Sequence, residues 1–183
     1  RGGAVLLNSS SAVTFTRVTL TNNDSAMDGG AIASASSTSG IVLILEECIV
    51  SNNNGGVNTF SDGGGIYSSG GNTTLTKCSI YGNSCGDDGG GVYISEFGSV
   101  NTFTNCVISG NTAGLAADGM ETIDGGGVAL LDGISTMTNC TIANNTCTGM
   151  AGEGFGGGIA IPSAILHMTN NIFADNTADA GNG

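Results

Sequence analysis

The sequence predicts an all-β protein, a parallel β-helix in which about six coils stack into a solenoid. A nine-residue segment, FTNCVISGN at Phe103–Asn111, is present in six related copies, and a glycine-rich tetrapeptide precedes every copy. Such internal periodicity indicates stacked repeats and outranks any local propensity. The other copies are LTKCSIYGN at 75–83, MTNCTIANN at 137–145, MTNNIFADN at 168–176, FTRVTLTNN at 15–23 and LEECIVSNN at 45–53.

The glycine element marks the start of each coil. We expect a single domain over residues 1–183, either a segment of a longer solenoid or a subunit that stacks on further copies. Neither end carries a polar cap in this sequence, so the apolar first and last coils are expected to pair end to end. The elements are GGAV at 2–5, GGAI at 29–32, GGGI at 63–66, GGGV at 89–92, GGGV at 125–128 and GGGI at 156–159.

Short strands, rather than helices, are expected within each coil. The runs are rich in Val, Ile and Thr and are bounded by glycine, which is typical of strands. No segment carries the i, i+3, i+4, i+7 apolar stripe of a helix. Alignment of the copies predicts three core columns: Phe15, Leu45, Leu75, Phe103, Met137 and Met168; Leu20, Val50, Ile80, Ile108, Ile142 and Phe173; and Val5, Ile32, Ile66, Val92, Val128 and Ile159.

Two polar columns accompany the core. Stacked Asn amides hydrogen-bond along the axis of a solenoid, so a structural ladder is predicted at Asn23, Asn53, Asn83, Asn111, Asn145 and Asn176. Four of the six cysteines, Cys48, Cys78, Cys106 and Cys140, share one phase in consecutive coils. Vertical neighbours at that spacing satisfy the Cα separation of a disulfide, but a column of buried thiols that act as small hydrophobes is the favoured interpretation.

The composition excludes several partners. Three Lys and Arg against 15 Asp and Glu give a net charge of −12, which disfavours nucleic acids and anionic membrane surfaces. No run approaches the 18 apolar residues of a spanning helix. We therefore expect no nucleic-acid partner and no transmembrane segment.

The repeat resembles that of the polymorphic outer membrane proteins and of bacterial right-handed β-helix repeat proteins. The residues that carry the resemblance are GGAI at Gly29–Ile32 and the F-x-x-N pattern FADN at Phe173–Asn176, with variants in the other coils. This resemblance implies a right-handed solenoid that is secreted or exposed at the cell surface, often as an adhesin or an autotransporter passenger.

Polysaccharide lyases and hydrolases also use β-helices, so a glycan-binding or polysaccharide-degrading protein is the alternative. That chemistry needs clustered carboxylates or a calcium site with a basic residue. The only basic residues are Arg1, Arg17 and Lys77, with His167 the single imidazole, and none is in phase with the acidic pair Asp87 and Asp88. No catalytic residue is therefore assigned, and the protein is expected not to be an enzyme.

Two further patterns suggest weaker alternatives. Asp28, Asp62, Asp88 and Asp124 each precede a glycine pair, either as turn residues or as a ladder that binds Ca²⁺ between coils. No other cofactor is expected. Threonine flanks the first core column, as in TFT at 102–104 and TMT at 136–138, a pattern also seen in ice-binding proteins.

The long segments after the Asn column are the expected site of partner contact. They carry apolar residues that are unusual in solvated loops: Phe60, Leu115, Met120, Met150 and Phe155. Loops on one face of a solenoid often bind, and surface glycans or a protein are the expected partners. The main hypothesis is a non-catalytic, extracellular or cell-surface structural or adhesive solenoid that assembles end to end into a filament. A cation-dependent scaffold and an ice-binding protein are the weaker alternatives.

Overall fold

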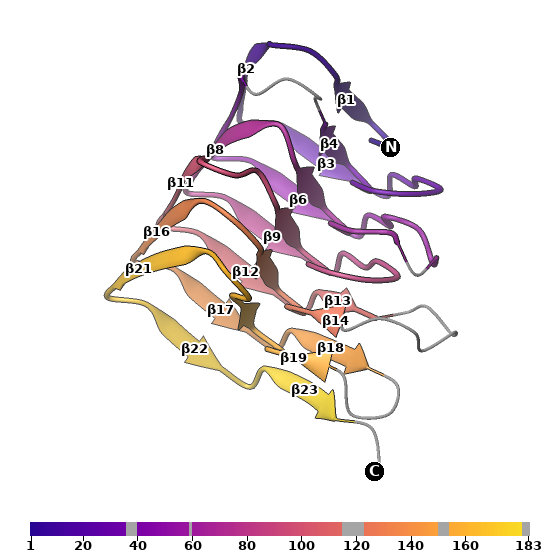
Figure 1. Ribbon diagram of the computed structural model, residues 1–183, viewed down its shortest axis with the longest axis vertical. Helices are drawn as coiled ribbons and strands as arrows, with labels where there is room; N and C mark the ends of the chain where they lie inside the picture. Colours follow the sequence, from indigo (N-terminus) through magenta and orange to yellow (C-terminus); the bar gives the residue numbers. More distant parts are fainter. Residues whose placement is uncertain (36–39, 59, 115–122, 150–153, 181–183) are drawn as a thin grey trace.

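The computed structural model, which describes residues 1–35, 40–58, 60–114, 123–149 and 154–180, is a parallel β-helix of six coils (Figure 1). Each coil contributes one strand to each of three parallel six-stranded sheets. Sheet A contains β1 (Val5–Leu7), β4 (Ile32–Ser34), β7 (Ile66–Ser68), β10 (Val92–Ile94), β15 (Val128–Leu130) and β20 (Ile159–Ala160).

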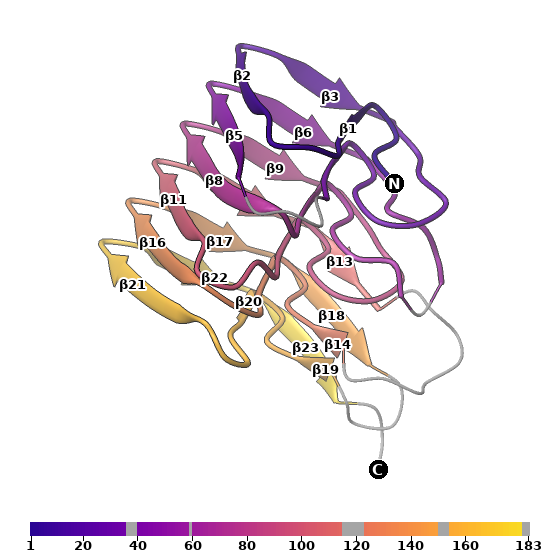
Figure 2. The ribbon, with the colours of Figure 1, turned by 45° about the horizontal axis from the view of Figure 1, so that its top comes forward.

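Sheets B and C complete each coil, and the coils lie one above another (Figure 2). Sheet B contains β2 (Ala12–Thr16), β5 (Ile41–Glu46), β8 (Gly71–Thr76), β11 (Val100–Thr104), β16 (Ile134–Thr138) and β21 (Ile165–Thr169). Sheet C contains β3 (Thr19–Thr21), β6 (Ile49–Ser51), β9 (Ser79–Tyr81), β12 (Val107–Ser109), β17 (Thr141–Ala143) and β22 (Ile172–Ala174).

The segments after sheet C form two small sheets on one side of the solenoid. One contains β13 (Thr112–Ala113), β18 (Thr146–Gly149) and β23 (Thr177–Ala180), and the other pairs β14 (Ile123–Asp124) with β19 (Gly154–Phe155). In the described part of the chain every element is a strand, and no helix is long and apolar enough to cross a membrane.

The register confirms the three predicted core columns. Phe103 pairs with Leu75 on one side and Met137 on the other, and Ile108 and Val92 pair with their predicted equivalents in the same way. Phe103, Ile108 and Val92 are fully buried in one continuous core. Core and surface residues alternate along each strand because successive side chains of a strand point to opposite faces of the sheet.

The turn between sheets B and C uses one left-handed residue per coil. Lys77 and Asn105, for example, have φ of 53° and 54°. Asn tolerates this conformation better than most residues because its short side chain bonds locally. The six turn residues are Arg17, Glu47, Lys77, Asn105, Asn139 and Asn170.

The glycine element is required because the backbone is too crowded there for a side chain. A Cβ on Gly64 would lie 2.6 Å from the backbone of Ser84, at the end of the same coil, and closer still to the carbonyl oxygen of Gly90 in the next coil. A Cβ on Gly90 would likewise lie 2.5 Å from the backbone of Thr112, and closer still to the carbonyl oxygen of Gly126 in the next coil. The recurrent glycines therefore mark a backbone-to-backbone contact that runs along the solenoid.

Candidate functional site

The Asn column forms a continuous hydrogen-bonded ladder through the six coils. In each step the Nδ2 group donates to the Oδ1 atom of the Asn in the next coil, over 2.9 Å from Asn111 to Asn145. The same Oδ1 atom accepts the backbone N–H of Asn111, over 3.0 Å. Nδ2 of Asn111 also donates to the carbonyl oxygen of Ile80. The amides are thus fully used in stacking coils, which is the structural role the sequence predicted.

The cysteine column is a row of free, buried thiols. Each Sγ atom donates to a carbonyl oxygen of the preceding coil, as from Cys106 to Leu75 over 3.4 Å. The pKa of Cys106 lies well above its ordinary value because Cys140 and Cys78 flank its thiol and because it is buried. Cys85, in the separate buried cluster with Ala113 and Cys147, also has a raised pKa because of burial. A thiolate nucleophile is therefore disfavoured at both positions.

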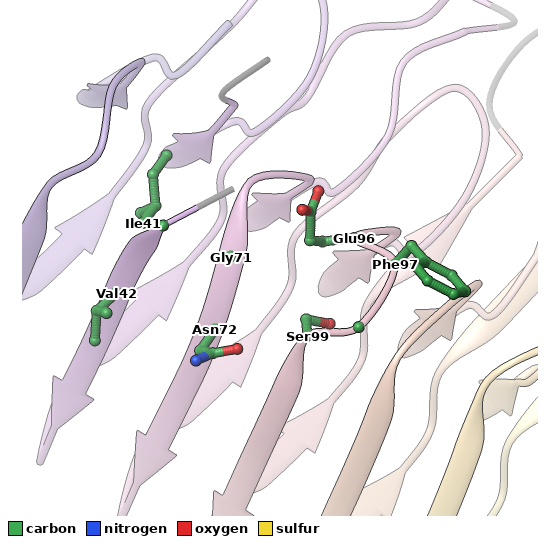
Figure 3. Close-up of a pocket in the computed structure, with 9 residues that line it drawn as sticks. Ile41, Val42, Gly71, Asn72, Glu96, Phe97 and Ser99 are labelled. Atoms are coloured by element: carbon green, nitrogen blue, oxygen red, sulfur yellow. The ribbon is translucent and has the colours of Figure 1, made fainter. Parts of the chain in front are cut away.

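A groove opens on the outer surface where sheet A turns into sheet B, with a volume of about 270 Å³ (Figure 3). Its floor is Gly71 and Asn72 at the start of β8. One wall belongs to coil 2, at residues 40–42, and the other to coil 4, at residues 96–99. Phe97 stands on the rim with 87 % of its surface exposed.

The predicted acidic column is present but is not a ladder of equivalent carboxylates. Nε of Arg1 lies 2.6 Å from Oδ2 of Asp28, so this carboxylate is neutralised by an ion pair. Oδ1 of Asp28 accepts the backbone N–H of Asp62, and Oδ1 of Asp62 accepts that of Asp88, each over 3.3 Å. The backbone of Asp124 lies in β14, and its side chain is outside the described part.

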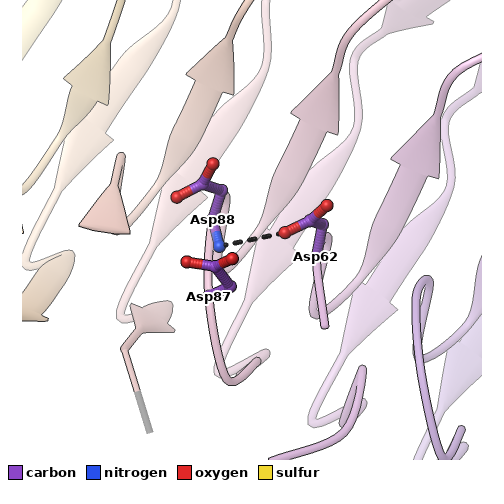
Figure 4. A group of neighbouring side chains, drawn as sticks. All are labelled: Asp62, Asp87 and Asp88. Atoms are coloured by element: carbon purple, nitrogen blue, oxygen red, sulfur yellow. Dashed lines mark hydrogen bonds between the residues drawn. The ribbon is translucent and has the colours of Figure 1, made fainter. Parts of the chain in front are cut away.

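Among the described residues, Asp87, rather than Asp28, joins Asp62 and Asp88 in a cluster of carboxylates (Figure 4). Their carboxylate oxygens lie within 4.8 Å of one another. Burial raises the pKa of Asp62 to about 7, and the charge of Asp28 adds to this shift, although the N–H of Asp88 opposes it. Three oxygen donors suit Ca²⁺, so calcium binding stays a prediction, now for a different set of carboxylates.

Two stacked tyrosines lie beside this cluster, a feature that the sequence reasoning missed. The rings of Tyr67 and Tyr93 are 5.2 Å apart and parallel to within 3°, and the guanidinium of Arg1 sits 5.3 Å from the ring centre of Tyr67. Burial and the nearby Asp62 raise the pKa of Tyr93. Both tyrosines follow an aligned core residue directly, in GGGIY and GGGVY, so their shared phase was a visible signal.

The raised pKa of Asp62 predicts that stability falls as the pH rises from about 4 to about 7. Across this interval the unfolded chain, with an ordinary pKa of 3.8, releases a proton that the folded chain retains. Asp62→Asn keeps the acceptor for the N–H of Asp88 and should remove this fall. Thermal melts at pH 4 to 8 measure this loss of stability. In a chain of this size, each kcal/mol lost from the free energy of unfolding should lower the melting temperature by on the order of 2–4 °C.

Asp175→Asn, at an exposed turn, is the matched control and should keep the wild-type pH profile. A wild-type melting temperature that does not decline between pH 4 and 7, or an equal decline in Asp62→Asn, contradicts the prediction. Repeating the series with EDTA and with Ca²⁺ tests the calcium prediction. A melting temperature that EDTA leaves unchanged at pH 8 would dismiss it.

The threonine files lie on the outer face of sheet B. Thr74, Thr102 and Thr136 are stacked in consecutive coils, and Thr76, Thr104 and Thr138 are stacked beside them. Coil 2 interrupts the files with Ile44 and Glu46, and coil 6 interrupts the first with His167. The face is thus regular over coils 3 to 5, and ice binding stays an untested prediction.

The predicted partner-contact residues are described only in part. Phe60 and Phe155 are exposed by 65 % and 53 %, as expected for residues available to a partner. Leu115, Met120 and Met150 lie outside the described residues. The exposed aromatic residue of the groove, Phe97, was missed, because nothing in the sequence distinguishes its turn from an ordinary one.

Comparison with known proteins assigns the fold. The family model described as "Right handed beta helix region" matches residues 3–183, nearly the whole chain. None of the curated proteins and none of the solved structures compared with the chain matches it. The match supports the parallel β-helix expected from the repeats and the right-handed coil that the family resemblance implied, and this family contains both enzymes and non-enzymes.

Proposed function

The chain belongs to the right-handed β-helix family, and we propose that it is a non-catalytic structural or adhesive solenoid at a cell surface or outside the cell. The observation that carries this proposal is the Asn ladder. The residues that recur in every coil are used in stacking one coil on the next, as the contacts of Asn83, Asn111 and Asn145 show. The repeated residues of this chain therefore make the stack of coils rigid. The resemblance to polymorphic outer membrane proteins supports the location and stays a proposal.

The distribution of charge supports an adhesive role. The chain has a net charge of −12, yet the outer faces of sheets B and C are almost uncharged. Among the outward-facing residues of their strands, all of which the structure describes, Glu46 is the only carboxylate, and sheet C has no charged residue. The acidic residues instead gather in the turns and in the segments after sheet C. Faces with so few charges allow contact with a neutral partner at little cost of desolvating charges.

End-to-end assembly is proposed from the sixth coil. Met168 and Phe173 continue two core columns, but they are 52 % and 47 % exposed, whereas their column neighbours Met137 and Ile142 are fully buried. A further coil, whether of a longer chain or of a second copy, would cover them. Exposed apolar edges of this kind favour strand pairing.

The alternative is a polysaccharide-degrading enzyme that uses Asp62, Asp87 and Asp88. A specific observation favours it: carboxylates at this separation, one with a pKa near 7, are the kind used for acid–base catalysis. Against it, Asp87 is buried, and the cluster lies outside the groove.

An assay for new reducing ends on a panel of polysaccharides separates the two functions, combined with electron microscopy of the purified chain. The proposal predicts rods or filaments and no new reducing ends. Release of reducing ends by the wild type that Asp62→Asn abolishes would overturn it in favour of the enzyme.

A further inference from the structure

The groove arises from a difference in turn length between neighbouring coils. Between sheets A and B, coil 3 has only Ser69 and Gly70, whereas coil 4 has the five residues Ser95–Ser99. The short turn leaves the start of β8 uncovered, and the longer turn forms a wall beside it (Figure 3). The pairing of β8 with β5 and β11 holds Gly71 and Asn72 in register, so the floor of this hollow has a fixed place in the coil stack.

The groove presents a fixed amide and a carboxylate. Oδ1 of Asn72 accepts the N–H of Val100 over 2.8 Å, which holds the amide plane in place. Its Nδ2 group lies on the side of β5, as Figure 3 shows, and has no hydrogen-bond partner among the described residues. Glu96 lines the groove on the side of coil 4 and offers acceptor oxygens, and its carboxylate points away from Asn72 (Figure 3). The site thus supplies both a donor and acceptors.

The aromatic ring extends this site along the axis. Phe97 points from the wall of the groove away from Asn72, toward the following coil (Figure 3). Val100 and Ile134, which are stacked on the outer face of sheet B, are also exposed. The amide and the carboxylate of the groove are therefore followed, in the direction of the axis, by an exposed ring and two apolar side chains.

The chemistry of this surface narrows the class of ligand. No Lys or Arg lines the groove, and the chain carries a net charge of −12, so phosphate and carboxylate groups are disfavoured. A peptide cannot add as a strand here, because β8 is already paired with β5 and β11 on its two edges. A ligand with many hydroxyl groups and an apolar face satisfies both the polar groups of the groove and the ring of Phe97.

We propose that the groove and Phe97 bind an extended neutral oligosaccharide that lies along the solenoid axis. One sugar unit occupies the groove and bonds to Asn72 and Glu96, and the next packs its C–H face on the ring of Phe97. This inference rests on the proposed adhesive function and names the chemical class of the surface that the solenoid recognises.

Isothermal titration of the purified chain with cellohexaose, mannohexaose and maltohexaose tests the inference, with a hexamer of galacturonic acid as the anionic comparison. We expect at least one neutral hexasaccharide to bind and the anionic one not to bind. Phe97→Ala should weaken binding about tenfold or more, because it removes the stacking face. The exposure of Phe97 means that the fold should be retained.

Met27→Ala is the matched control, since Met27 is a large apolar residue, 46 % exposed, that lies outside the groove. It should bind like the wild type. Asn72→Asp keeps the acceptor for Val100 but loses the donor, and it should also weaken binding. The inference is overturned if no neutral hexasaccharide binds at millimolar concentration, if Phe97→Ala binds like the wild type, or if the galacturonic acid hexamer binds equally well.

These results are independent of the test of the proposed function. Rods that release no reducing ends and bind no neutral hexasaccharide overturn the oligosaccharide site alone. New reducing ends that depend on Asp62 overturn the proposed function, whatever the binding at Phe97.

Discussion

Asn111→Ala is expected to lower the free energy of unfolding by about 3–5 kcal/mol. The side chain is fully buried and makes four hydrogen bonds: two donated by Nδ2, to Ile80 and Asn145, and two accepted by Oδ1, from the backbone and side chain of Asn83. Alanine leaves the carbonyl oxygen of Ile80 and the N–H of Asn83 without this partner. Unpaired buried groups of this kind account for most of the cost.

Urea denaturation measures this effect, and Asn23→Ala provides a graded control from the same column. Asn23 is only partly buried, and its hydrogen bonds in the ladder are those that its backbone N–H and Nδ2 donate to Asn53. Asn23→Ala should therefore lower the free energy of unfolding clearly less than Asn111→Ala does. Equal effects at the two positions, or a change below about 1 kcal/mol at Asn111, would mean that the ladder does not stabilise the stack.

Gly64→Ala should be more damaging, with a loss above about 4 kcal/mol or no folded protein at all. The added Cβ would sit 2.6 Å from backbone atoms of Ser84 and closer to the carbonyl oxygen of Gly90. Both contacts are with backbone atoms, and Gly90 belongs to the next coil. The steric clash can therefore be relieved only if the two coils separate. Separation would weaken the strand pairing on both sides of the turn.

Gly110→Ala separates this steric effect from conformational strain. Gly110 has a φ of 62°, but nothing lies within 4 Å of the position that a Cβ would take, so alanine costs only the strain of the left-handed conformation, about 1–2 kcal/mol. Circular dichroism and urea melts of the two variants give the comparison. A folded Gly64→Ala protein with the stability of Gly110→Ala would refute the close coil contact.

The sequence was sufficient to predict the coil architecture because equivalent residues of successive repeats are neighbours in the stack. Phe103, Ile108 and Asn111 have equivalents at matching phase in every copy, and stacking places equivalent residues directly above one another. Alignment of the copies therefore amounts to a map of contacts along the axis. The core columns, the shared phase of the four column cysteines and the threonine files all follow from this property, whereas the free state of the thiols comes from the structure.

The candidate sites could not be predicted in the same way because they depend on positions that do not repeat. Asp87 has no counterpart in most coils, and its approach to Asp62 follows from the path of one turn. The groove depends on the short turn of coil 3 beside the longer turn that carries Phe97. Arg1 neutralises Asp28 through a contact between the start of the first coil and its end, which phase alone does not reveal.

Hydrogen exchange of the Asn side-chain amides, followed by NMR in D₂O, is the decisive test of the ladder. A continuous ladder predicts that the Nδ2 protons of Asn53, Asn83, Asn111 and Asn145 exchange as slowly as the backbone amides of the core strands, since both open only with the stack. The side-chain amide of Asn8, which is exposed, should exchange at once. Exchange of all the Asn side chains at the rate of Asn8 would contradict the role of the column in holding the coils together.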